Sequence, residues 1–285
     1  SFDYLAMQFR LWKRMGMAVG FLPFSTVGYS LSNTSELTKD EDGTVINKTA
    51  SYAGDGGLQQ VFAGVGFKVL DNLSIGANIS YIYGDITHSV TTAFSNSSSF
   101  SSVRLDKISI NDYKLDFGLQ YSYKFNKKHV LNFGAVYSLG HSVNGKGYKY
   151  NQKWLNGADY PSTQTGDTIT NAFSLPHTFG AGLTYVYDNR LTIGADFTYQ
   201  QWEDAKFYNE KSYFSNRTKI AAGAEFVPNP YSRNYLKRVR YRVGGYYSDP
   251  YTKVDGQDGT REYGVSAGFG FPLFQSKSIL NISGQ

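Results

Sequence analysis

The chain has 285 residues, contains no cysteine and carries a formal net charge of +5 at pH 7. Without cysteine it can form no disulfide, metal-thiolate site or cysteine nucleophile. Lysine and arginine form no block longer than two or three residues, which argues against a nucleic-acid partner. Since this length allows one domain or two, the hydrophobic pattern has to decide the fold class.

The hydropathy profile excludes a bundle of membrane helices. Mean hydropathy is −0.39, and no run approaches the roughly 18 apolar residues that a transmembrane helix requires. A membrane β-barrel can nevertheless be hydrophilic on average, because only every second residue of its strands faces lipid. The high counts of Tyr (24), Phe (20) and Gly (30) favour such a barrel, in which aromatic residues form two interfacial belts.

Alternation of apolar and polar residues recurs along the whole chain. The clearest strand covers residues 114–125, where Leu115, Phe117 and Leu119 alternate with Asp116, Gly118 and Gln120. This period of two predicts a strand with one apolar and one polar face. Comparable runs, in chain order, cover residues 73–81, 131–139, 179–185, 191–199 and 263–271. We count about twelve strands, several of them longer than the ~9–11 residues that cross a bilayer.

The connections between these strands separate a barrel from a two-sheet soluble sandwich, whose strands also alternate. Short turns are expected at residues 13–14, 71–72, 126–128, 188–189, 228–237 and 272–276. Long polar loops are expected between them, at residues 35–55, 93–102, 151–174, 207–212 and 249–259. Short turns on one rim and long loops on the other are typical of an all-β, antiparallel up-and-down transmembrane barrel with the short side in the periplasm.

Strand direction gives the expected total. The first strand of this chain descends into a short turn and the twelfth ascends out of one, so a barrel with both ends in the periplasm needs one more strand on each side. We therefore expect residues 1–285 to form most of a single barrel of about fourteen strands. A preceding N-terminal plug and first strand, and a following last strand, would lie outside the chain.

Two stretches resemble a known family: LPHTFGAGLTYVYDNRLTIGADFTYQQW (175–202) and MGMAVGFLPFSTVGYS (15–30). They resemble the FadL-type outer-membrane transport proteins for long-chain fatty acids and aromatic hydrocarbons. The many Tyr and Lys residues and the Ser/Asn-rich loop look like a Bacteroidetes member. The resemblance implies fourteen strands, a plug in the lumen, and a ligand that leaves sideways through a kink in the third strand, which is the second strand of this chain.

That second strand contains Pro23. Proline has no N–H for the strand ladder, and a closed barrel has no edge strand on which to place it. A local break in pairing flanked by Phe21, Leu22 and Phe24 would form an apolar window for lateral exit of a ligand. The alternative is a β-bulge that only bends the strand.

Charged residues on the polar faces are expected to point into the lumen. Their mixed signs indicate a structural ion-pair network, since unpaired buried charges are costly. The alternative is that the arginines face the anionic head group of a ligand. The residues concerned are Lys114, Asp116, Asp196, Glu225, Arg238, Arg240, Arg242 and Glu262.

The remaining features predict binding rather than catalysis. Trp154, Leu155 and Tyr160 could form an outer apolar landing site or simply pack a loop. Four scattered histidines show no metal-ligand spacing, and no Ser–His constellation stands out. We therefore expect no enzyme, metal or cofactor, but passive uptake of a small hydrophobic compound through an outer-membrane channel in contact with membrane lipid and lipopolysaccharide. The alternatives are an outer-membrane scaffold with a protein partner at the extracellular loops, or a simple porin.

Overall fold

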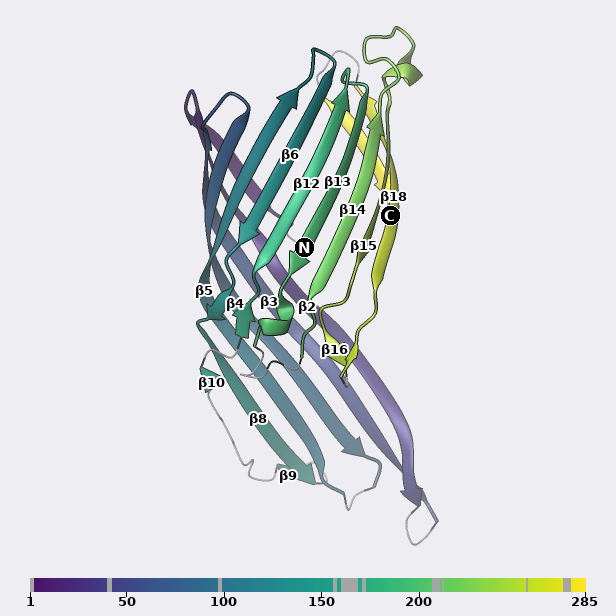
Figure 1. Cartoon of the computed structure of the whole chain (residues 1–285). Helices are drawn as coiled ribbons and strands as arrows, with labels where there is room; N and C mark the ends of the chain where they lie inside the picture. Colours follow the sequence, from purple (N-terminus) through teal and green to yellow (C-terminus); the bar gives the residue numbers. More distant parts are fainter. Residues whose placement is uncertain are drawn as a thin grey trace.

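The structure is a computed structural model that describes residues 3–39, 43–96, 99–155, 158–159, 169–170, 173–206, 211, 213–254, 256–273 and 278–285. Twelve antiparallel strands follow one another around a curved wall (Figure 1). In wall order they are β1 (Leu5–Trp12), β2 (Met15–Lys39), β3 (Val45–Lys68), β4 (Leu73–Phe94), β5 (Ser101–Lys124), β6 (His129–Ser138), β12 (Thr178–Tyr187), β13 (Leu191–Gln200), β14 (Arg217–Phe226), β15 (Arg240–Ser248), β18 (Glu262–Pro272) and β19 (Ile279–Gly284).

Shorter strands and two 3-10 helices lie in the connections between the wall strands. They are β7 (His141–Val143), β8 (Gly145–Leu155), β9 (Ala158–Asp159), β10 (Ile169–Thr170), β11 (Phe173–Leu175), β16 (Lys253–Val254), β17 (Gln257–Asp258) and the 3-10 helices η1 (Trp202–Asp204) and η2 (Tyr235–Arg238). No helix among the described residues is long and apolar enough to cross a membrane. The expected all-β barrel fold with antiparallel neighbours is confirmed.

Tight turns join the strands on one rim, at the top of Figure 1. The turn between β12 and β13 shows why: Asp188 and Asn189 have φ values of 48° and 53°. Two successive residues with positive φ match the right-handed twist of a hairpin, and Asp and Asn tolerate this conformation better than most residues. We call this end, formed by residues 13–14, 69–72, 125–128, 188–190, 227–239, 273 and 278, the short-turn rim.

The wall strands fall into two classes of length. β2 to β5 contain 22 to 25 residues each, whereas β6 and β12 to β14 contain 10. The far half of β5 pairs with β8, from Ser101↔Trp154 to Ile110↔Gly145. The additional length, residues 24–39, 45–59, 83–94 and 101–112 together with β8, forms a sheet beyond the opposite rim that we call the extension (Figure 1).

The extension corrects two expected loops. Residues 35–55 and 93–102 were expected as long loops, but β2 continues to Lys39, β3 begins at Val45 and β4 ends at Phe94. Their polar side chains are compatible with strands because they pair across the sheet. The Ser32 and Ser51 hydroxyls lie 3.3 Å apart, and those of Thr34 and Thr49 lie 3.0 Å apart. Such pairs stabilise neighbouring strands without an apolar face.

The extension has an apolar core on one face. Its fully buried members come from β3, β4, β5, β7 and β11: Leu58, Ile82, Ile108, Ile110, Val143 and Leu175. The small β7–β11 sheet therefore covers the inner face of the extension where the extension meets the barrel mouth. Gly56 (φ +111°) and Gly84 (φ +145°) lie beside this core in a backbone conformation that other residues rarely adopt.

The barrel wall itself presents apolar side chains to the outside. Val243 is 64% exposed, Val265 80% and Ile193 46%. These residues alternate with polar or small residues that face the lumen, as in a membrane strand. Aromatic residues gather at both ends of this apolar band, with Tyr137 and Tyr199 towards the mouth and Tyr185 and Tyr241 towards the short-turn rim. Two aromatic belts mark the limits of a membrane-spanning band.

The wall order ends at β1 on one side and at β19 on the other. Among the described residues, no pairing joins these two strands. The expectation of one further strand on each side, of a lumen plug and of a single barrel domain stays a prediction.

Candidate functional site

An apolar pocket of about 610 Å³ lies in the wall formed by β1 to β5. It is lined by Leu5, Met7, Val19, Gly20, Phe21, Val61, Phe62, Ala63, Ile79, Ser80, Tyr81 and Tyr113. The pairing of β1 with β2 ends here, at Leu5↔Phe21. The pocket therefore spans the first five strands of the wall and includes both members of the pair Leu5↔Phe21.

The predicted window residues flank this pocket. Phe21 lines it, and two residues later β2 contains a β-bulge: Pro23 pairs with Gln59 and Ser25 with Leu58, so that Phe24 is the extra residue. Phe24 packs against the core of the extension. Because a proline cannot donate to the ladder, a bulge at this position is the expected local solution.

The bulge does not open β2 from β3. Pairing continues on both sides of it, with Leu22↔Gln60 before and Ser25↔Leu58 after. The described pairing therefore leaves no opening between β2 and β3 beside Pro23. The part of Phe21, Leu22, Pro23 and Phe24 in ligand exit stays a prediction.

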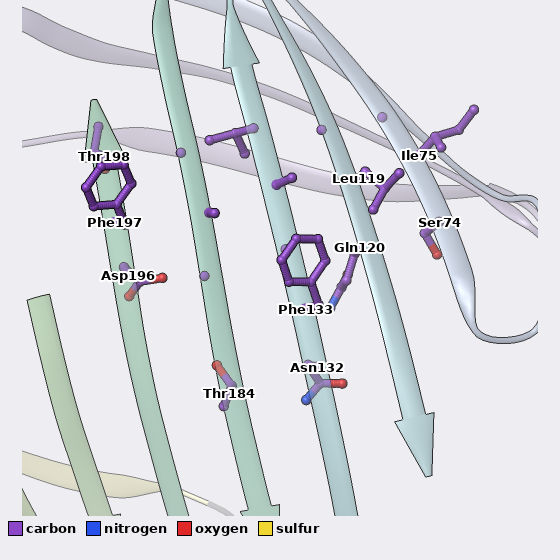
Figure 2. A pocket seen from close by; sticks show the side chains of 18 of the residues that line it. Ser74, Ile75, Leu119, Gln120, Asn132, Phe133, Thr184, Asp196, Phe197 and Thr198 are labelled. Atoms are coloured by element: carbon purple, nitrogen blue, oxygen red, sulfur yellow. The ribbon is translucent and has the colours of Figure 1, made fainter. Parts of the chain in front are cut away.

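A second pocket, of about 650 Å³, lies along β4, β5, β6, β12 and β13 in the middle of the wall (Figure 2). Its polar lining comes from the lumen-facing positions of these strands: Ser74, Gln120, Asn132, Thr184, Asp196 and Thr198. Glycine occupies successive paired positions, Gly66↔Gly76 and Gly76↔Gly118. Lacking side chains, these glycines leave the lumen wide at this height.

Asp196 lines this pocket and pairs with Gly182 of the neighbouring strand. An ideal Cβ placed on Gly182 would come within 2.3 Å of the Asp196 Oδ1 atom. Any side chain at residue 182 would therefore displace the carboxylate. Among the described residues, Asp196 has no ion-pair partner.

The other predicted lumen charges form separate groups and not one network. Lys114 pairs with Asp116, which also accepts a hydrogen bond from the Ser138 hydroxyl. On β18, Glu262 pairs with Arg217 at 3.6 Å. These groups pair locally within neighbouring strands.

The most extensive group surrounds Glu225. Its two carboxylate oxygens accept hydrogen bonds from Arg240 Nη1 at 2.9 Å and from Arg242 Nε at 2.7 Å. Arg242 also donates to Asn281 of β19 at 2.7 Å. The single glutamate thus holds both arginines, and the three charges together leave an excess of one positive charge.

Arg238 is a correction to the expected arginine row. It lies in η2, before β15 begins at Arg240, and its guanidinium lies 6.0 Å from the centre of the Tyr235 ring. The period of two seen in the sequence stops at the strand end, because a 3-10 turn does not continue the alternation of faces.

An aromatic cluster near the mouth was not predicted. Trp202 of η1 stacks on Tyr251 with ring centres 4.9 Å apart, and lies 5.3 Å from Phe214 and 6.2 Å from Phe173. Arg217 lies 5.7 Å from the Tyr251 ring centre. The four rings come from three separate connections, those that follow β6, β13 and β15, so no local pattern in the sequence could bring them together.

The predicted landing residues lie elsewhere. Trp154 and Leu155 are at the end of β8, where they pair with Asp159 and Ala158 of β9. Tyr160 lies outside the described residues. The expected landing site therefore stays a prediction for Trp154 and Leu155.

His141 contacts one aromatic and one acidic side chain. His141 stacks on Tyr113 with ring centres 4.7 Å apart, and its Nε2 atom lies 3.5 Å from Asp112. Within the described ranges no group of three His, Asp or Glu residues could hold a metal ion.

Comparison with known proteins supplies a family. The family model described as BamG matches residues 1–285. The chain belongs to the BamG family. No curated protein matches this BamG-family chain.

Solved structures share its fold at low sequence identity. The Pseudomonas putida toluene transporter TodX is 14% identical with a TM-score of 0.55, over 98% of this chain and 74% of that one. The CymD monoaromatic hydrocarbon channel is 11% identical with a TM-score of 0.57, over 98% and 75%. A Pseudomonas aeruginosa FadL homologue is 16% identical with a TM-score of 0.56, over 98% and 68%.

These likenesses confirm the FadL-type resemblance at the level of fold. The family to which the chain belongs carries a different name, BamG. Origin from Bacteroidetes stays a prediction.

Proposed function

We propose that this BamG-family chain is an outer-membrane channel for the passive uptake of small hydrophobic compounds, which leave sideways through the barrel wall beside Phe21. The observation that carries the proposal is the apolar wall pocket, which Phe21 lines two residues before the bulge at Pro23. The proteins of similar fold that are described as toluene or monoaromatic hydrocarbon channels support the same class of ligand.

The path has three parts along the wall. The aromatic cluster around Trp202 offers an apolar contact at the barrel mouth, the end opposite the short-turn rim. The glycine-lined lumen offers space between this mouth and the short-turn rim. The wall pocket then gives direct access to lipid, so that an apolar ligand never has to re-enter bulk water. Transfer of apolar surface from water into such an environment is favourable, and no cofactor or energy source is needed.

The test fills the pocket. Ala63 lines it on the outer face of β3, and Ala63→Trp places an indole in that space. Ala195→Trp is the matched control, because Ala195 also faces outward but lies on β13, away from the pocket. Uptake of radiolabelled toluene or oleate is measured in cells that produce each variant and whose lipopolysaccharide layer slows free diffusion.

We expect Ala63→Trp to lower uptake about tenfold, equivalent to ~1.4 kcal/mol on the barrier, and Ala195→Trp to leave it unchanged. Pro23→Val should also slow uptake, because valine permits a regular ladder at the bulge. Equal uptake by both tryptophan variants, with normal amounts of folded barrel, would remove lateral exit from the proposal.

The second candidate is an outer-membrane anchor for a protein partner. It is favoured by the exposed basic turn at residues 227–239, described next.

A further inference from the structure

Positive charge is concentrated on the short-turn rim. The described residues of this rim include eight Lys or Arg and only two acidic residues, Asp71 and Asp188. This local net charge of +6 exceeds the +5 of the whole chain. The rest of the protein is therefore slightly acidic, and the rim has the opposite sign.

One turn of this rim is longer than the others. Residues 227–239, which we call the proline turn because they contain Pro228 and Pro230, project beyond the rim as the green segment at the upper right of Figure 1. Buried Val227 and Val239, 5% and 2% exposed, fix its two ends to the barrel. A periplasmic turn of a membrane barrel is normally short, so this length requires an explanation.

Hydrogen bonds hold the proline turn in one shape. Asn229 N donates to Lys237 O at 2.8 Å across its base. The Asn229 side chain accepts from Tyr231 N at 3.0 Å, and the Asn234 side chain accepts from Leu236 N at 3.1 Å. Asn side chains that cap nearby N–H groups in this way make rigid turns.

The rigid turn displays apolar and basic side chains to solvent. Tyr231 is 92% exposed and Leu236 is 65% exposed. Arg233 and Lys237 between and beside them are exposed and have no ion-pair partner among the described residues. Tyrosine and arginine are the residue types most often found at the energetic centre of protein interfaces.

We propose that the proline turn is the docking site for a protein with an acidic surface on the periplasmic side of the membrane. A charged lipid surface would need only mobile basic side chains, which Lys127 and Lys128 already provide elsewhere on the rim. A fixed backbone that presents Tyr231 and Leu236 fits a shaped protein surface, because preorganisation lowers the entropic cost of binding. This inference goes beyond ligand uptake and does not depend on it.

The test begins in cells that make the protein naturally. The photo-crosslinking residue p-benzoyl-phenylalanine replaces Tyr231, which keeps an aromatic ring at the site. Crosslinks are compared in three backgrounds. The first has no further substitution, and the second carries the double charge reversal Arg233→Glu and Lys237→Glu. The third, the control, carries Lys127→Glu and Lys128→Glu, which change the rim charge by the same amount. Any protein captured is identified and purified, and its affinity for the full chain in detergent is measured at several salt concentrations.

We expect one discrete protein with an acidic surface, crosslinked in the unchanged and control backgrounds and lost in the first reversal. Its affinity should fall about tenfold with the Arg233 and Lys237 reversal and with rising salt, because both weaken electrostatic attraction. Tyr231→Ala should weaken binding as well, while heat-modifiable migration of every variant confirms a folded barrel.

Three results would overturn the proposal: crosslinks to phospholipid only, no crosslink at all, or equal loss of affinity in both charge-reversed pairs. Vesicles of phosphatidylglycerol and phosphatidylethanolamine test the lipid reading directly. Binding to them that drops equally in both pairs would assign the rim charge to lipid. Uptake of toluene or oleate is scored in the same variants, and its failure would count only against the channel.

Discussion

Glu225 is expected to be the most important charged side chain of the lumen wall. Its carboxylate accepts hydrogen bonds from Arg240 at 2.9 Å and from Arg242 at 2.7 Å, and its side chain is 26% exposed. Glu225→Gln keeps the size but removes the charge, so both guanidinium groups lose their counter-ion. A hydrogen bond to a charged group contributes ~1.5–3 kcal/mol. Because the arginine side chains are 38% and 37% exposed, we discount the two bonds together to ~1–2 kcal/mol.

The assay is urea unfolding of the barrel in lipid vesicles, followed by tryptophan fluorescence. Asp71→Asn is the matched control, since Asp71 also lies near two basic residues but is 87% exposed; its cost should stay below ~0.5 kcal/mol. Adding Arg242→Gln to Glu225→Gln should restore part of the lost stability, because one unpaired charge is removed. A Glu225→Gln barrel as stable as the wild type, or less affected than Asp71→Asn, would refute this account.

Two further predictions concern the extension. Asp85 lies there, outside the membrane band; the hydrogen bond from Ser109 and then the contact with Lys107 lower its pKa. The Asp85 carboxylate therefore contributes its full stabilisation above the unfolded-state pKa of about 4, and this stabilisation is lost as pH falls through the lower folded-state pKa. Amide hydrogen exchange of β4 and β5 should increase in that acidic range in the wild type but not in Asp85→Asn. Gly56→Ala should destabilise the extension by ~1–3 kcal/mol, because φ is +111° and the new Cβ would lie 2.2 Å from the Asp85 carbonyl oxygen. Gly28→Ala is the control, because a Cβ there would meet nothing within 4 Å. Protease resistance of the extension is measured in both variants, and Gly28→Ala should cost far less.

The wall strands could be predicted because each has one apolar face. The run at residues 191–199 corresponds to β13, and the Asp188–Asn189 turn precedes it as expected. A strand that faces lipid on one side and a polar lumen on the other must alternate, so the sequence records both its position and its orientation. The expected count of about twelve strands agrees with the twelve strands of the wall order.

The extension could not be predicted by the same rule. Residues 30–39 of β2 are exposed along their whole length, so neither face selects apolar residues. The bulge at Phe24 adds a second difficulty, because one extra residue moves every following side chain to the opposite face. Alternation counted straight through Pro23 therefore assigns the far half of β2 to the wrong face.

The arginine run at residues 238–242 shows where the candidate site depended on structure. In sequence its three arginines share one spacing, which indicated one row within a lumen ion-pair network and, as the alternative, a surface for an anionic head group. In the structure Arg240 and Arg242 share Glu225, whereas Arg238 belongs to the turn outside the barrel. Most of the positive charge available for a partner thus lies on the short-turn rim and not in the lumen. A wall whose inner charges are largely paired and whose pocket beside Phe21 is apolar supports the proposal of a neutral hydrophobic ligand over that of an anion.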